Sequence, residues 1–268
     1  MSSTPASLFA AASILLYLAA TVLYWRSEAL KSWSQLAGAA AIACHSLSLV
    51  LVLAQFEAFQ FGFGPAVSLF AWQCAFFVLL ASLARPLHHL GLVIYPIAAV
   101  AVAATGLLPV SAPGDAFNGG LALVAHILLS LLAYGLLTIA AVQSLVLLLQ
   151  DRGLRQHHIP GWLQRLPALE TMEQLLFQII TLGFLLLSLS LFSGLLFLDD
   201  LFAQHLVHKT VLSFLAWLIF AVLIWGRWQF GWRGRKAIHW TLGGYSGLIL
   251  AYFGSKWVLE VILQQRWG

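Results

Sequence analysis

The feature that most constrains this chain is a run of 30 residues without a charged side chain, from Leu121 to Gln150. Its sequence is LALVAHILLSLLAYGLLTIAAVQSLVLLLQ. About 20 apolar residues are enough for one α-helix to cross the hydrocarbon core of a bilayer. The run therefore predicts a transmembrane helix.

The rest of the chain has the same character. Of its 268 residues, 62% are hydrophobic and only 8% are charged, and the mean hydropathy is +0.94. A water-soluble globular domain needs far more polar surface. We predict an all-α, polytopic membrane helix bundle that forms one transmembrane domain over residues 1–268 and lies in the lipid bilayer. The eight expected spans are about 6–25, 33–56, 66–84, 89–108, 121–149, 174–198, 210–229 and 238–262.

The basic residues predict the orientation of these spans. Ten of the 13 Lys and Arg residues follow spans one, three, five and seven: Arg26, Lys31, Arg85, Arg152, Arg155, Arg165, Arg227, Arg233, Arg235 and Lys236. Lysine and arginine concentrate in cytoplasmic loops, so both termini are expected to be extracytoplasmic. The same loops account for the net charge of +4, and no nucleic-acid partner is expected. Because no basic residue precedes the first span, we expect a transmembrane helix there and not a cleaved leader.

One polar stripe stands out in the charge-free run. His126, Ser130, Tyr134 and Thr138 recur at every fourth position, which places them on one slowly winding face of a helix. Lipid cannot hydrogen-bond these side chains, so the stripe is expected to face protein, water or a ligand. Two interpretations remain open. The stripe bonds to neighbouring helices, or His126 is an axial ligand of a haem iron.

A second imidazole, His45, lies near the middle of span two. Such a side chain is costly at membrane depth unless it is neutral and hydrogen-bonded. It has three candidate roles: a structural hydrogen bond, a ligand or haem contact, and a proton relay. The two cysteines, Cys44 and Cys74, form no CxxC, and the chain has no CxxCH for covalent haem attachment.

The N-terminal end of span seven carries a further group of polar residues. Lys209, Ser213 and Trp217 follow one another at four-residue spacing, with His208 beside them and His205 in the preceding loop. They are expected on the same side of the membrane as His126, where they predict a polar mouth between spans five and seven. The alternative is a solvated loop whose lysine extends to the headgroups.

The predicted cytoplasmic loops hold only solvated or interfacial residues. GWRGRKA, residues 231–237, is interpreted as an anchor whose arginines contact lipid phosphates. The histidine pairs 88–89 and 157–158 lack companion metal ligands and are interpreted as solvated. No nucleotide-binding, metalloprotease or nucleophile motif occurs in a plausible setting, so no catalytic residue and no enzyme activity are expected.

Several stretches, in order along the chain, carry a resemblance to a known family. They are AHILLSLLAYGLL (125–137), LETMEQLLFQIITLGFLLLSLSLFSGLLF (169–197), HKTVLSFLAWLIFAVLIWGR (208–227), GWRGRKA (231–237) and LAYFGSKWVLE (250–260). The chain resembles the CcsA/HemX-type cytochrome c assembly proteins, most closely their YpjD inner-membrane branch, over a core of about 45–263. The resemblance implies a multi-pass protein of the bacterial inner membrane.

The resemblance also implies haem handling at the outer face of the bundle. His126 falls where the family has its first outer histidine. The family's tryptophan-rich loop should precede span seven, but LDDLFAQHLV (198–207) contains no tryptophan. Trp225 replaces the intramembrane histidine expected in span seven, and no second outer histidine stands near Ser255.

We therefore predict haem handling without the tryptophan-rich loop: binding, transfer or homeostasis of haem b. The predicted cofactor-binding residues are His126 as a possible axial ligand of the iron, His208, His205 or His45 as a second ligand, and Tyr134 in the same stripe. The alternative function is a non-catalytic accessory subunit of another membrane protein, such as a transporter. A solute transporter is a third interpretation. Helices broken by glycine or proline would support it, and Pro96 alone interrupts a predicted span.

Overall fold

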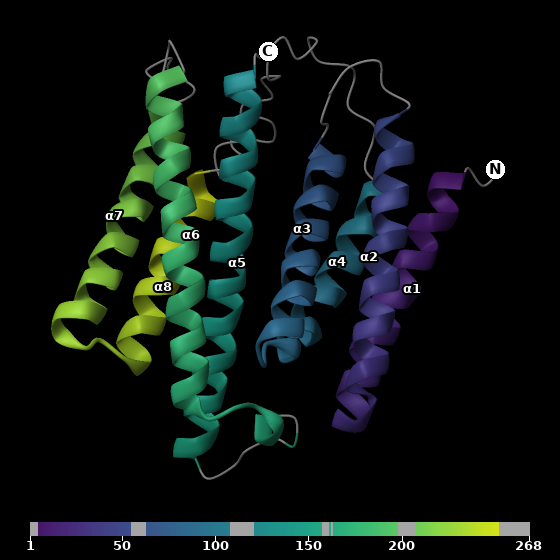
Figure 1. The fold of residues 1–268 in the computed structure, drawn as a ribbon, viewed down its shortest axis with the longest axis horizontal. Coiled ribbons are helices and arrows are strands. Elements are labelled where there is room, and N and C mark those ends of the chain that lie inside the picture. The colour runs from purple at the N-terminus through teal and green to yellow at the C-terminus, as the bar shows by residue number, and fades with distance from the viewer. Residues whose placement is uncertain are drawn as a thin grey trace. The chain divides into compact units, whose positions relative to one another are not determined.

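The computed structural model describes residues 5–54, 63–107, 121–156, 161, 163–197 and 207–251. Within these ranges the regular structure is entirely helical, which confirms the predicted all-α class (Figure 1). The α-helices are α1 (Pro5–Arg26), α2 (Lys31–Leu53), α3 (Phe63–Ala84), α4 (Gly91–Leu107), α5 (Leu121–Arg155), α6 (Leu169–Phe197), α7 (Val207–Phe230) and α8 (Gly234–Ile249).

Seven of the eight helices in these ranges are long and apolar enough to cross a membrane. They agree with the first seven predicted spans to within a few residues, because the length of each apolar run sets the length of its helix. The described part of α8 is shorter, with 16 residues. The remainder of the eighth predicted span, 238–262, lies outside the described residues beyond position 251.

The chain divides into two compact units, Met1–Asn118 and Gly119–Gly268. In the first unit, α1 packs against α2 and α4, and α3 packs against α2 and α4 (Figure 1). Gly38 of α2 leaves room for the side chain of Tyr95, which extends from α4. A Cβ atom at Gly38 would lie only 2.8 Å from the hydroxyl oxygen of Tyr95. The single transmembrane domain stays a prediction.

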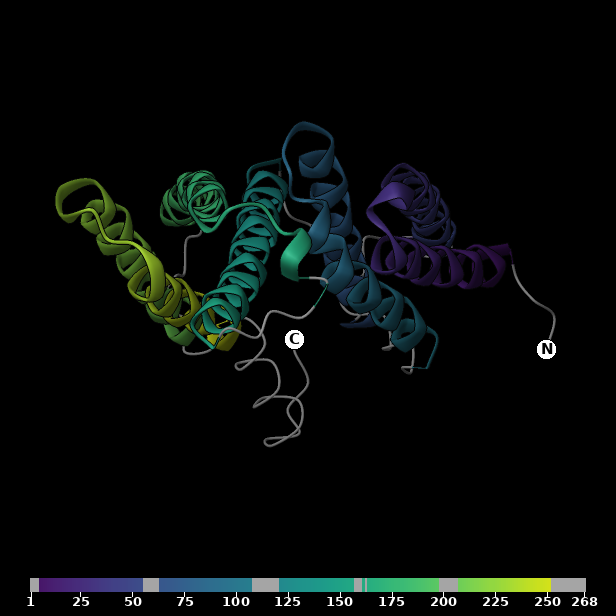
Figure 2. The same ribbon diagram turned by 90° about the horizontal axis from the view of Figure 1, so that it is seen from below.

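In the second unit, α5 packs against α6 and α8, and α7 packs against the same two helices. The antiparallel helices α7 and α8 are joined by a turn of residues 231–233, visible in both ribbon views (Figures 1 and 2). Gly231 and Gly234 bound this turn with φ angles of 63° and 57°, in the left-handed region that glycine adopts without strain. Gly226 lies one turn earlier, where a Cβ atom would meet the Trp232 ring at 2.5 Å.

One prediction about a connection was wrong. His88 and His89 were expected to be solvated, but they form a 3₁₀ turn with Leu90 between α3 and α4. His89 is only 2% exposed, and the ring of His88 lies edge-on to Tyr24 of α1 at a centroid distance of 5.1 Å. This pair therefore belongs to the packed end of the first unit. The other pair, residues 157–158, lies outside the described residues.

Candidate functional site

The polar stripe of α5 meets two different helices. Members of the stripe are four residues apart, so each step turns through 400° and displaces the side chain by about 40° around the helix. Three steps from His126 to Thr138 amount to about 120°. The structure shows the result: His126 and Ser130 bond to α6, whereas Thr138 bonds to α8.

His126 is half-buried and contacts α6 through one ring nitrogen. Its Nδ1 lies 2.9 Å from the hydroxyl oxygen of Ser193. The ring lies against Gly194, where a Cβ atom would come within 3.0 Å of the ring carbon Cε1. Nε2 makes no hydrogen bond to any residue that the structure describes.

The hydrogen bonds of Ser193 favour one tautomer of the His126 ring. Ser193 donates its single proton to the backbone carbonyl of Ser190 at 2.8 Å. With that bond made, its oxygen accepts from the imidazole, which favours the tautomer protonated at Nδ1. In this tautomer Nε2 holds the lone pair. This assignment rests on counting donors and acceptors, because hydrogen positions follow from the hydrogen-bond network.

A second serine contact continues this ladder between α5 and α6. Ser130 donates to the backbone carbonyl of His126 at 2.8 Å, and its oxygen lies 2.6 Å from that of Ser190. Since the proton of Ser130 is already used, Ser190 is the donor of the contact between them. Every hydroxyl proton of the ladder therefore has one acceptor.

Farther along α5 the stripe turns to α8. Thr138 donates to the carbonyl of Tyr134 at 2.7 Å and accepts from the hydroxyl of Tyr245 at 2.8 Å. Tyr134 itself is half-buried. It lies eight residues from His126, or about 12 Å along the helix axis.

His45, in the first unit, uses both of its ring nitrogens. The hydroxyl of Tyr17 in α1 lies 3.2 Å from Nδ1, and the hydroxyl of Ser68 in α3 lies 2.8 Å from Nε2. The ring is 1% exposed. A metal ligand needs a free lone pair, so this geometry favours the structural hydrogen bond among the three predicted roles.

The other predicted residues are only partly described. His208 lies in the first turn of α7, but its side chain, His205 and the loop at 198–206 lie outside the described residues. Trp217, predicted at a polar mouth between spans five and seven, instead donates to Ser188 of α6 at 2.8 Å. Phe184 and Phe214 stack with its ring. Among the described residues, no group of three or more His, Cys, Asp and Glu side chains could hold a metal ion.

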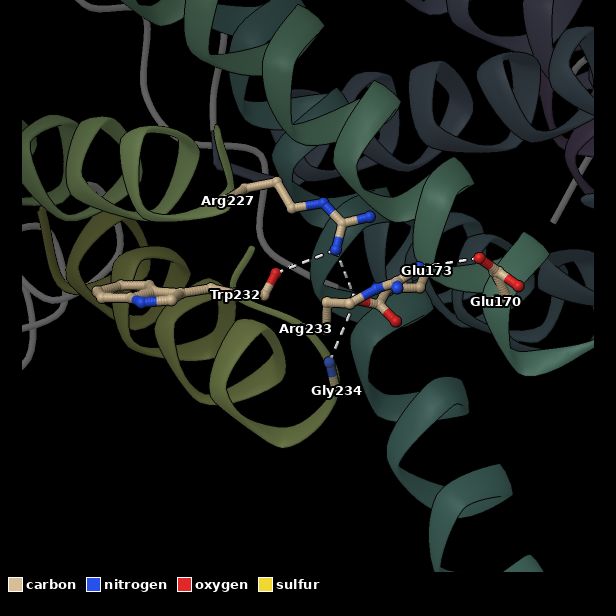
Figure 3. A network of polar contacts seen from close by, with 6 residues as sticks. All are labelled: Glu170, Glu173, Arg227, Trp232, Arg233 and Gly234. Carbon is tan, nitrogen blue, oxygen red and sulfur yellow. Dashed lines mark hydrogen bonds and ion pairs between the residues drawn. The ribbon is translucent and has the colours of Figure 1, made fainter. Parts of the chain in front are cut away.

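The sequence interpretation missed a cluster of ion pairs around Glu173 of α6 (Figure 3). One of its carboxylate oxygens accepts from Arg227 of α7 at 3.1 Å and from the backbone N–H of Gly234 at 3.2 Å. Arg233 lies 3.7 Å from the same oxygen and bonds to Glu170 at 2.9 Å. The side chain of Glu173 is only 6% exposed. A single carboxylate thus joins α6, α7 and the N-terminus of α8.

Two neighbouring contacts strengthen this end of the unit. Arg235 of α8 bonds to Asp151 of α5 at 3.0 Å, and Asp151 also pairs with Arg155. Lys236 lies over the ring of Trp232 at 3.8 Å. The arginines of 231–237 were predicted to contact lipid phosphates. In the structure, Arg233 and Arg235 bond to carboxylates of the protein.

Comparison with known proteins then decides the family. The model of the cytochrome c assembly protein family matches residues 33–263. The chain belongs to this family. The match contains the predicted core at about 45–263, and it confirms the resemblance seen in the sequence.

Three curated relatives illustrate the range of similarity. The inner membrane protein YpjD of Escherichia coli (strain K12) is 39% identical over 140 residues, which cover 52% of this chain and 53% of that protein. An uncharacterized 28.8 kDa protein of Azospirillum brasilense is 30% identical over 192 residues, 70% of each chain. The cytochrome c biogenesis protein CcsA of Synechococcus sp. (strain CC9902) is 24% identical over an alignment of 279 residues, 92% of each chain.

The chain spans about half the length of the YpjD protein that it matches. No solved structure matches it significantly. The family match, the inner-membrane relative and the seven apolar helices together identify a multi-pass protein of the bacterial inner membrane.

Proposed function

We propose that this chain handles haem in cytochrome c assembly and binds haem b near the N-terminal end of α5, with Nε2 of His126 as an axial ligand. The observation that carries the proposal is the hydrogen-bond ladder to α6. It favours the tautomer with the proton on Nδ1, in which Nε2 has a lone pair without a hydrogen-bond partner among the described residues. When bound, haem would supply an iron centre that an imidazole nitrogen can ligate, and His126 would be the residue that holds it.

The surroundings of His126 fit this role. Histidines that ligate metals donate their second ring N–H to an acceptor, which fixes the tautomer and the ring orientation. The Ser193 hydroxyl is such an acceptor. The ring is half-buried at the bundle surface, and Gly194 leaves room for it against α6.

A hydrogen bond to a neighbouring helix alone would not distinguish a ligand from a structural histidine. The two imidazoles of this chain provide the comparison. His45 is fully enclosed and has hydrogen-bond partners at both nitrogens, whereas His126 is half-buried and has a partner at one. We therefore propose a structural role for His45, and we keep His208 and His205 as candidate second ligands.

The sequence of residues 198–207, which lacks tryptophan, narrows the proposal further. Planar aromatic rings are what a docking loop would offer to a porphyrin face. A loop without tryptophan offers fewer such rings, and it is better suited to hold or pass on haem than to present it for covalent attachment. We propose a carrier or an auxiliary in haem homeostasis.

An absorption spectrum of the detergent-purified protein, combined with a pyridine haemochrome assay, tests this function. We expect a Soret band and equimolar haem b in the wild type, and loss of both in His126→Ala. Thr138→Ala is the matched control, because it removes a polar member of the same stripe that bonds to α8. We expect this variant to have the haem content of the wild type.

A colourless wild type, even after haem supply during expression, would contradict the proposal. It would favour the accessory-subunit interpretation instead. In that case a stoichiometric membrane partner should co-purify with the wild type and with His126→Ala alike.

A further inference from the structure

We infer that Ser193 and Gly194 of α6 are positioning residues that fix the tautomer and the orientation of the His126 ring. This inference rests on the proposed function. Neither residue was singled out in the sequence as part of a haem site. Both lie on the face of α6 that contacts α5.

Ser193 acts through the direction of its own hydrogen bond. It is buried, and its hydroxyl donates to the carbonyl three residues earlier, a bond that helical serines readily form. With its proton engaged, the oxygen offers only a lone pair to His126. Of the two neutral tautomers of the imidazole, only the one protonated at Nδ1 makes this bond while Ser193 keeps its proton on the carbonyl of Ser190. The other tautomer would require Ser193 to turn its proton from the carbonyl of Ser190 to Nδ1 and so to give up its own backbone hydrogen bond.

Gly194 acts through the space that it leaves open. A Cβ atom there would lie 3.0 Å from Cε1 and 3.5 Å from Nδ1 of His126. A methyl group would push the ring away from α6 and lengthen the bond to Ser193. The adjacent residues thus fix the ring together, one by hydrogen bonding and the other by allowing contact.

The consequence for haem is a defined ligand atom. Without the acceptor at Ser193, a neutral imidazole populates both tautomers, and the one with hydrogen on Nε2 has no lone pair to offer there. Loss of such an outer partner typically weakens metal binding by about 10–100-fold. We expect Ser193→Ala to weaken haem binding by about 10–100-fold. Ser193→Thr keeps the hydroxyl and should bind haem with the affinity of the wild type.

A purely structural role for these small residues makes a different prediction. If Ser190, Ser193 and Gly194 only allow α5 and α6 to approach, their substitution would alter stability but not the state of the ring. Two control variants separate the effects. Ser188→Ala removes another back-bonding serine of α6, one that faces Trp217, and Gly243→Ala adds a methyl group where nothing lies within 4 Å.

The experiment has two readouts on the full-length protein in detergent. The first is haem affinity, measured by titration of haem-free protein followed at the Soret band. The second does not require haem: ¹⁵N NMR of histidine-labelled, haem-free protein, with the His126 signals assigned from His126→Ala. We expect a protonated Nδ1 and an unprotonated Nε2 in the wild type, Ser193→Thr and both controls. Ser193→Ala and Gly194→Ala should show mixed tautomers and weaker haem binding.

A wild-type spectrum with hydrogen on Nε2 would overturn the inference, and so would an unchanged ring and unchanged affinity in Ser193→Ala. A failure of the proposed function can be distinguished from a failure of this inference. Absence of haem binding in every form, with the tautomer change of Ser193→Ala intact, would remove the haem site while supporting the positioning of the ring by α6.

Discussion

At the scale of single residues, the ring of His45 shows how a polar side chain is accommodated inside the first unit. Its two hydrogen bonds, to Tyr17 and Ser68, join α2 to α1 and α3. His45→Ala would leave both hydroxyls without this partner and open a cavity in the packed core. We expect a loss of about 2–5 kcal/mol in the free energy of unfolding, the range for large-to-small substitutions in a core.

The measurement is unfolding of the purified protein in detergent, together with haem content per folded chain. The neighbouring variant Ser46→Ala is the control. Ser46 accepts one bond from Trp72, and interhelical hydrogen bonds in membranes contribute about 0.6 kcal/mol on average. We expect haem content to persist in both variants. Loss of haem from a His45→Ala protein of unchanged stability would contradict the structural role and indicate a ligand.

The sequence predicted the polar stripe of α5, because four-residue spacing is a local property of a helix. It did not predict Ser193, which is separated from His126 by 67 positions. A serine in an apolar helix has no signal that reveals whether its oxygen donates or accepts. That role depends on the carbonyl of Ser190 and on the register of α5 against α6, neither of which the spacing determines.

At the scale of helices, the carboxylate of Glu173 holds α6, α7 and α8 together at one end of the second unit. Glu173→Gln would remove the charge between Arg227 and Arg233. Breaking a fully buried ion pair costs about 3–5 kcal/mol. Because Arg227 keeps 24% of its side chain exposed, we expect a smaller loss of about 2–3 kcal/mol in the free energy of unfolding.

Glu170→Gln provides the matched control for this prediction. Its carboxylate bonds to the same Arg233, but its side chain is 68% exposed, and exposed ion pairs contribute about 0–1 kcal/mol. Limited trypsin digestion gives a local readout beside global unfolding. Cleavage after Arg233 and Arg235 should accelerate in Glu173→Gln and stay near wild type in Glu170→Gln. Equal rates in the two variants would show that the cluster does not hold the turn.

Helix positions were predictable because apolar runs of spanning length leave few alternatives. The contacts made by helix ends were not. His88 and His89 were interpreted as solvated because they lie in a predicted loop without companion metal ligands, yet a 3₁₀ turn places His88 against Tyr24, 64 positions away. Glu173 and Arg227 are likewise 54 positions apart. Such pairs are determined by how helices pack, which apolar periodicity alone does not specify.

In the second unit, basic residues concentrate at one end of the helices. Helix α5 illustrates this arrangement. Its 35 residues correspond to about 52 Å, longer than the 40–45 Å of a complete bilayer with its headgroups. His126 lies near its N-terminal end, whereas Arg152 and Arg155 lie in its last turn. The proposed haem site and the basic cluster therefore occupy opposite ends of one transmembrane helix.

The orientation of this helix determines the membrane face at which the proposed site lies, and it leads to the last prediction. The ion pairs of Arg233 and Arg235 with carboxylates do not weaken the expected orientation, because acidic residues contribute little to the positive-inside rule. Both termini should thus be extracytoplasmic. Alkaline phosphatase fused after Gly268 should be active, and green fluorescent protein at that position should be dark. Fusions after Lys236, in the chain truncated there, should show the reverse. The opposite pattern at both sites would place His126 at the cytoplasmic face, where the site could receive haem from the cytoplasm but could not deliver it outside.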